Sequence, residues 1–127
     1  MKTTASTYDK GAETLRKLLG NEKAENVISR FRNLNPEFEK EAVSVVFGRT
    51  WSREAIDAKT RALFSIAILS TAGRVNALKI VFEIALSNGA TMEEITEVLL
   101  QVGIYAGYPA ALDAFQILSQ MQTEHQK

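Results

Sequence analysis

The residues best suited to chemistry lie in the stretch 101–116, and none of them is a cysteine. Gln101 and Tyr105 are four positions apart, so on a helix they share one face and would present an amide and a phenol to the same ligand. The same stretch is rich in Gly and Ala and ends in Phe115 and Gln116. Small side chains leave space for a cavity whose polar groups would be Gln101, Tyr105 and Gln116. They also permit close helix packing, and both interpretations stay open.

A second candidate segment lies at 49–53, where Arg49 and Arg53 flank Trp51. A guanidinium group binds a carboxylate through two parallel hydrogen bonds, and an indole ring would supply a wall beside it. In the alternative interpretation, Trp51 covers helix ends while the arginines lay their stems on apolar surface and keep their charges in water. The segment therefore predicts either an anion site at Arg53 or a structural plug.

The usual catalytic groups are missing from this chain. It has no cysteine, and its one histidine is His125. A metal site would need several soft ligands, and a serine nucleophile would need a neighbouring base. The glycine patterns that bind nucleotide phosphates are absent as well. We therefore expect no metal, no cofactor and no thiol chemistry.

Composition narrows the class of protein further. A chain of 127 residues fits a single domain, 1–127, and an apolar content of 46% supplies its core. Fifteen basic residues balance fifteen acidic ones, which predicts no attraction to nucleic acid or to an anionic membrane. No run approaches the roughly 20 apolar residues of a membrane span, and the first residues lack the apolar core of a signal peptide. The expected compartment is the cytoplasm.

Helix signals dominate the whole chain. Asn35 before Pro36 is typical of an N-cap and a first helical position, and Thr91 with Glu94 forms a capping box. Glycines such as Gly20 and Gly48 are typical of helix ends. These signals predict an all-α fold, a single compact bundle-like domain of about seven helices with a loop at 49–56 and a frayed tail at 123–127. The expected helices cover 8–19, the region around 27–31, 36–47, 58–72, 75–87, 92–106 and 109–121.

Read in order, these segments resemble the carboxymuconolactone decarboxylase family over almost the whole chain. The strongest part of the resemblance is Glu94-Ile-x-Glu97-Val-Leu-Leu-Gln101. Further matching pieces are Tyr8-Asp-Lys-Gly11, Asn35-Pro-Glu-Phe38, Gly48-x-x-Trp51-x-Arg53, Ala72-Gly73-Arg74, Asn88-Gly89, Ile104-Tyr-Ala-Gly107-x-Pro109 and Ala114-Phe115. The resemblance implies an all-α homo-oligomer, a trimer or hexamer. It also implies cofactor-free loss of CO2 from 4-carboxymuconolactone, a step of aromatic catabolism.

The alkylhydroperoxidase branch of this family carries a Cys-x-x-Cys pair with a histidine four residues later. The corresponding positions here are Arg74, Ala77 and Val81, so the chain cannot act as a thiol peroxidase. The decarboxylase branch usually has histidines where this chain has Val81 and Gln116. A histidine suits proton transfer near neutral pH, whereas valine cannot transfer a proton and glutamine only donates a hydrogen bond.

Two functions follow from the resemblance. The first is a lyase with a drifted substrate, a small carboxylate or lactone, in which Arg53 holds the anion and Tyr105, Gln101 or water handles the proton. Its pocket would include Trp51, Val81, Phe115 and Gln116. The second is an oligomeric family member that binds a small molecule or a partner without catalysis.

Overall fold

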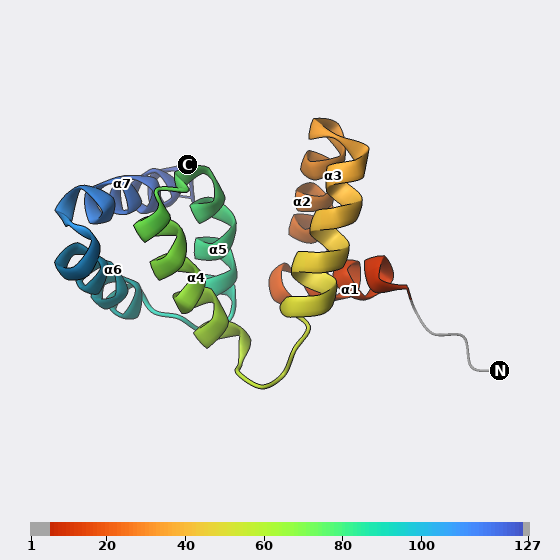
Figure 1. Ribbon diagram of the computed structural model, residues 1–127, viewed down its shortest axis with the longest axis horizontal. Helices are drawn as coiled ribbons and strands as arrows, with labels where there is room; N and C mark the ends of the chain where they lie inside the picture. The colour runs from red at the N-terminus through yellow and green to blue at the C-terminus, as the bar shows by residue number, and fades with distance from the viewer. Residues whose placement is uncertain (1–5, 126–127) are drawn as a thin grey trace. The chain divides into compact units, whose positions relative to one another are not determined.

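The computed structural model describes residues 6–125, with side chains up to residue 124. Helices are the only regular secondary structure over this range (Figure 1). Seven α-helices and one π-helical segment form two compact units, the first ending at Asp57 and the second beginning at Ala58. No strand occurs in 6–125. The prediction of an all-α fold with seven helices is therefore confirmed. The prediction of one domain over 1–127 stays a prediction.

The first unit begins with two helices, α1 (Thr7–Leu19) and α2 (Asn21–Leu34). Ser6 caps α1, because its hydroxyl accepts a hydrogen bond from the backbone N–H of Asp9 at 3.0 Å. Gly20 separates the two helices with a φ of 87°, a conformation that glycine adopts without steric cost. The two helices pack against each other through buried Leu15, Ala24 and Ile28. The predicted helix end at Gly20 is confirmed.

The next helix differs from the prediction in its second half. Asn35 caps α3 (Pro36–Glu41), and its side chain accepts a hydrogen bond from the N–H of Phe38 at 2.9 Å. Beyond it, the chain continues without interruption as a π-helix, η1 (Ala42–Thr50). The predicted end at Gly48 was wrong by two residues, so the loop covers 51–57 rather than 49–56.

Gly48 was misread because it serves close packing rather than a helix end. Its φ is not positive, and a Cβ there would lie 2.3 Å from the carbonyl oxygen of Thr7 on α1. Gly11 faces the same crossing from α1, where a Cβ would lie 1.9 Å from the carbonyl oxygen of Val43. The two glycines thus let the backbones of α1 and η1 touch. This crossing is the main contact of the first unit.

The second unit begins with α4 (Ala58–Ala72) and α5 (Val75–Ser87), which Figure 1 draws side by side in green. The two helices pack together through side chains that are fully buried, among them Ile66, Leu78 and Phe82. A turn at Gly73, with a φ of 71°, reverses the chain between them. Both helices match their predicted bounds.

The last two helices are α6 (Met92–Ala106) and α7 (Tyr108–His125). The predicted capping box opens α6, with Glu94 N–H donating to the Thr91 hydroxyl at 3.0 Å and Thr91 N–H donating to the Glu94 carboxylate at 2.9 Å. The final helix begins one residue before the predicted Pro109 and runs four residues beyond 121. Thr123–His125, predicted as part of a frayed tail, is helical, while 126–127 lies outside the described residues.

The small residues of α6 and α7 serve the packing of these two helices. A Cβ on Gly103 would lie 3.0 Å from the ring of Tyr108 and 3.6 Å from the Cβ of Ala111. Ala111 and Ala114 are themselves buried. Close helix packing therefore accounts for these positions. No described helix is both long and apolar enough to span a bilayer.

Candidate functional site

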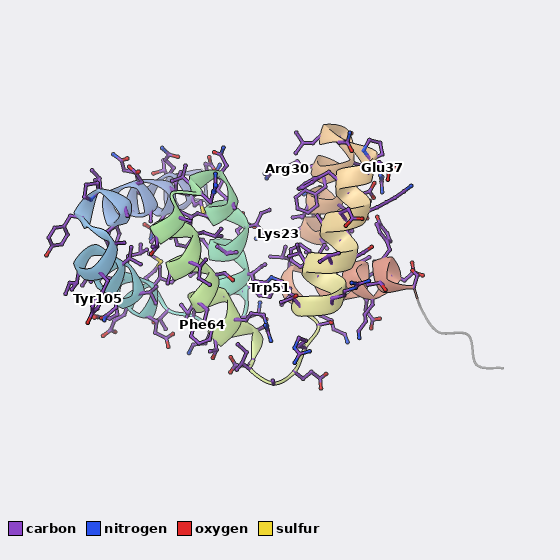
Figure 2. All side chains as sticks on the ribbon, viewed as in Figure 1. Lys23, Arg30, Glu37, Trp51, Phe64 and Tyr105 are labelled. Carbon is purple, nitrogen blue, oxygen red and sulfur yellow. The ribbon has the colours of Figure 1, made fainter. Side chains whose placement is uncertain are left out.

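A groove of about 570 Å³ lies in the second unit, between α4 and α6. Its volume lies within the range of small-molecule sites. Figure 2 labels one residue from each wall, Phe64 on α4 and Tyr105 on α6. The wall from α4 consists of Thr60, Leu63, Phe64, Ala67 and Thr71, and the wall from α6 consists of Glu97, Val98, Gln101, Val102 and Tyr105.

Helical spacing explains how each wall forms. The lining positions of α4 recur every three or four residues, so one face of the helix supplies them all. On α6 the polar members Glu97, Gln101 and Tyr105 are four apart and form one polar stripe. Most of the remaining lining is aliphatic or aromatic. The groove is thus mostly apolar, with a polar stripe along its α6 wall.

An ion pair joins the first turns of the two walls. The Lys59 ammonium lies 2.8 Å from the Glu94 carboxylate, which also accepts the capping bond from the N–H of Thr91. The hydrogen bond from Lys59, with a smaller contribution from that N–H, holds the pKa of Glu94 below its usual value. Glu94 therefore stays ionised, and it both starts α6 and ties that helix to α4.

A second polar cluster lies in the first unit and shares no residue with the groove. Glu39 is 6% exposed and receives two hydrogen bonds from the Arg32 guanidinium, at 3.1 and 2.9 Å. The Tyr8 hydroxyl donates a third to the same carboxylate. Hydrogen bonds from Arg32 and then Tyr8 lower the pKa of Glu39, whereas burial raises the pKa of Tyr8. The cluster joins α1, α2 and α3, and both carboxylate oxygens of Glu39 accept hydrogen bonds in it.

No group of three or more His, Cys, Asp or Glu side chains within the described part of the chain is arranged to hold a metal ion. The chemistry available in the groove therefore rests on a carboxylate, an amide, a phenol and two threonine hydroxyls.

Comparison with known proteins agrees with this architecture. The model of the carboxymuconolactone decarboxylase family matches residues 36–120, which is more than half of the chain. The chain belongs to this family.

Two relatives of this chain are named as different decarboxylases. The chain is 28% identical to 4-carboxymuconolactone decarboxylase of Acinetobacter baylyi over 90% of its own length and 85% of that protein. It is 28% identical to nitrosuccinic acid decarboxylase of Metarhizium robertsii over 84% of its length and 75% of that protein. It is also 33% identical to an uncharacterised 15.0 kDa protein of Paracoccus denitrificans, over 72% of this chain and 69% of that one.

Two of the site residues predicted from the sequence lie together in the groove. Gln101 and Tyr105 both line it, and both are exposed to solvent, Tyr105 with 83% of its surface. Their shared face follows from the four-residue spacing and the uninterrupted helix α6.

Three further predicted residues lie elsewhere in the second unit. Val81 is 8% exposed and belongs to the core on α5. Phe115 is half-buried and Gln116 is exposed, both on α7. None of the three contributes to the lining of the α4/α6 groove. Val81 and Gln116, where the sequence resemblance implies histidines, thus present neither a base nor an acid to this groove.

Trp51 and Arg53 belong to the first unit, where Figure 2 labels Trp51. The Trp51 ring lies 6.2 Å from the ring of Phe47, and its backbone N–H donates to the carbonyl of Val46 at 2.9 Å. Trp51 therefore covers the end of η1, which agrees with the structural interpretation of this residue. Arg53 is exposed, and its role as an anion site stays a prediction.

Glu97 and the whole α4 wall are groove residues that were not predicted from the sequence. Glu97 stands four positions before Gln101, so the spacing that linked Gln101 with Tyr105 also pointed to it. Thr60 and Thr71 carried no such signal, because only the packing of α4 beside α6 brings them to the groove.

Proposed function

We propose that the protein is a cofactor-free lyase that removes CO2 from a small molecule bound in the α4/α6 groove, and that its substrate differs from 4-carboxymuconolactone. The observation that carries this proposal is the polar stripe of Glu97, Gln101 and Tyr105 along an otherwise apolar groove of small-molecule size. Membership of the carboxymuconolactone decarboxylase family supports the reaction class. The relatives named for two different decarboxylations support a scaffold whose substrate changes.

The proposed reaction has three steps. The carbon–carbon bond to the carboxylate breaks, its electron pair stays on the substrate as an enolate, and a proton must then reach carbon. Tyr105 and Gln101 line the groove. In this proposal Tyr105 donates the proton, directly or through water, and Gln101 donates a hydrogen bond to the enolate oxygen. An anion-binding role for Arg53, which belongs to the first unit, is a separate proposal.

The drift in substrate rests on the residues that replace histidine. Val81 is buried in the core and Gln116 faces solvent, so the proton donor of this chain must be a different group. We therefore propose a different substrate, one whose enolate is protonated by a phenol and stabilised by an amide rather than served by an imidazole.

The experiment measures CO2 release from a panel of carboxylates that includes 4-carboxymuconolactone and nitrosuccinic acid. We expect catalytic turnover of at least one panel member, with 4-carboxymuconolactone not the best. The matched variant is Gln101→Ala, with Gln116→Ala as its control, because Gln116 is equally polar but lies outside the groove. Absence of turnover across the panel, or equal losses in both variants, would refute the proposal.

A second candidate function is small-molecule binding without catalysis. It is favoured by the buried Val81, since no histidine serves the groove. Binding of a panel member with no CO2 release, in the parent protein and in Val81→His alike, is the result that selects this function.

Assembly into a homo-oligomer, a trimer or hexamer, is also proposed. Its support is the set of large apolar side chains outside the groove lining that the second unit leaves exposed on α4, α6 and α7: Ile68, Leu100, Ile104, Tyr108 and Leu112.

A further inference from the structure

One charged side chain lines the α4/α6 groove, the carboxylate of Glu97. It is exposed, and no ion pair joins it to another of the side chains 6–124. Two basic residues flank the lining residue Thr60 in sequence: Lys59 is paired with Glu94 at 2.8 Å, and Arg61 is half-buried and not free either. Among the residues that line the groove, the one charged group is thus the carboxylate of Glu97, set among mostly apolar walls.

We infer that the groove binds an uncharged or cationic apolar group and rejects an anionic one, and that Glu97 is the residue that sets this selectivity. Two negative charges close together repel each other, and they repel more strongly beside apolar walls, where the effective dielectric constant is lower. A cation at the same place is attracted to a comparable degree. The sign of the ligand's charge thus determines its affinity for the groove, because the shape of the groove admits a cation and an anion alike.

This inference deepens the proposed function and rests on it only for the groove being a ligand site. It specifies the substrate class: a molecule whose body in the groove is neutral and apolar, with its departing carboxylate outside the lining. A substrate with a second carboxylate on that body would meet Glu97. Because Glu97, Gln101 and Tyr105 follow one another at four-residue spacing, the selecting charge lies on the same stripe as the proposed reacting groups.

The test uses three probes of one shape and different charge: 1-naphthalenemethylamine as the cation, 1-naphthalenemethanol as the neutral form and 1-naphthoate as the anion. Affinities are measured by titration calorimetry at pH 7 and low salt, and the side-chain amide resonance of Gln101 reports whether each probe occupies the groove. We expect the cation to bind about tenfold more tightly than the anion, with the neutral probe between them. The ratio should shrink at 1 M salt, which screens exposed charges.

Glu97→Gln keeps the shape of the side chain and removes its charge. We expect this variant to bind the cation and the anion within about twofold of each other. The matched control is Glu93→Gln, which removes an equal charge one turn earlier on α6 from a residue outside the lining, and which should keep the parent ratio. Melting curves by circular dichroism establish that both variants are folded.

Three results would overturn the inference: tighter binding of the anion in the parent protein, an unchanged ratio in Glu97→Gln, or no binding of any probe. The outcome is separate from that of the CO2 assay. Charge selection without turnover would leave this inference standing and remove the lyase, whereas turnover with no role for Glu97 would do the reverse.

Discussion

Tyr105 is the most exposed large side chain of the groove, with 83% of its surface accessible. A phenol in that position reaches a ligand without any rearrangement of the protein. Gln101, one turn earlier, offers both an amide donor and an amide acceptor. At the scale of single residues, the proposed chemistry therefore depends on hydroxyl and amide groups rather than on the imidazole that the family pattern suggests.

Replacing Tyr105 with phenylalanine removes the phenol and keeps the ring. On the best substrate of the CO2 panel, we expect kcat to fall about 100-fold, because a positioned proton donor contributes on that order, while KM changes little. Tyr108→Phe is the control, since Tyr108 packs over Gly103 and does not line the groove. An unchanged kcat in Tyr105→Phe would show that another group, or water, delivers the proton.

Part of this site could be predicted from the sequence alone. The pairing of Gln101 and Tyr105 is a local property of one helix, so spacing was sufficient to find it. Thr60, Phe64 and Thr71 belong to a helix some 30 or more residues earlier, and only tertiary packing assigns them to the groove. Glu97 was within reach of the same spacing argument, because it stands four positions before Gln101 on the same helix.

At the scale of helices, one carboxylate holds three of them together. Glu39 on α3 accepts hydrogen bonds from Arg32 on α2 and from Tyr8 on α1. The carboxylate is buried, so its charge is tolerated only because these donors satisfy it. Protonating Glu39 would weaken the bonds that keep its pKa low.

Acid should therefore destabilise the first unit through Glu39. Because the folded-state pKa of Glu39 is lowered, its contribution is complete above the ordinary value of 4.5 and is lost as the pH falls through the folded-state value. We expect the urea midpoint to fall progressively below about pH 4.5, and to fall less in Glu39→Gln. Glu37→Gln serves as the control, because the Glu37 side chain is 81% exposed. Parallel pH profiles for the parent and Glu39→Gln would contradict this account.

The crossing of α1 and η1 makes a second prediction at the same scale. Gly11→Ala would place a methyl group 1.9 Å from the carbonyl oxygen of Val43, so the helices must separate. We expect a loss of about 3 kcal/mol in the free energy of unfolding, as for a severe case of overpacking.

The comparison variant for that crossing is Gly20→Ala. An alanine there meets no atom within 4 Å but must adopt φ 87° and ψ 164°, a region essentially restricted to glycine, which costs about 1–3 kcal/mol. Denaturant unfolding of both variants gives the order, and an equal loss in the two would mean that the crossing has room to relax.

Helix bounds were predictable where a side chain caps the backbone, as at Asn35 and Thr91. The π-helix was not, because no residue type specifically favours hydrogen bonds to the fifth residue back. Gly48 illustrates the ambiguity. A glycine is equally typical of a helix end and of a close backbone approach, and the structure uses it for the second.

At the scale of the whole molecule, the second unit leaves more apolar surface exposed than isolated side chains would explain. Ile68, Ile104 and Tyr108 are each at least 65% exposed, and they come from three different helices. Large exposed apolar patches on small proteins are typical of interaction surfaces. A further copy of the chain is the partner that the family resemblance implies.

Sedimentation velocity at micromolar concentration should give a mass that is a multiple of the 14.1 kDa chain. Ile104→Asp places a charge on the exposed apolar surface without touching the groove lining, so we expect it to shift the protein toward the monomer. Ser119→Asp, an exposed polar site on α7, should leave the mass unchanged. A parent protein that sediments as a monomer would refute the assembly.

The π-helical path of η1 also affects how this chain is compared with others. Each π-helical turn takes up one more residue than an α-helical turn, so a relative with an ordinary α-helix here would cover the same axial distance with fewer residues. Pairing the two chains residue by residue across Ala42–Thr50 would then shift Trp51 and Arg53 out of register. A gap placed within η1, rather than in the loop that follows, is the alignment that keeps those two side chains opposite their counterparts.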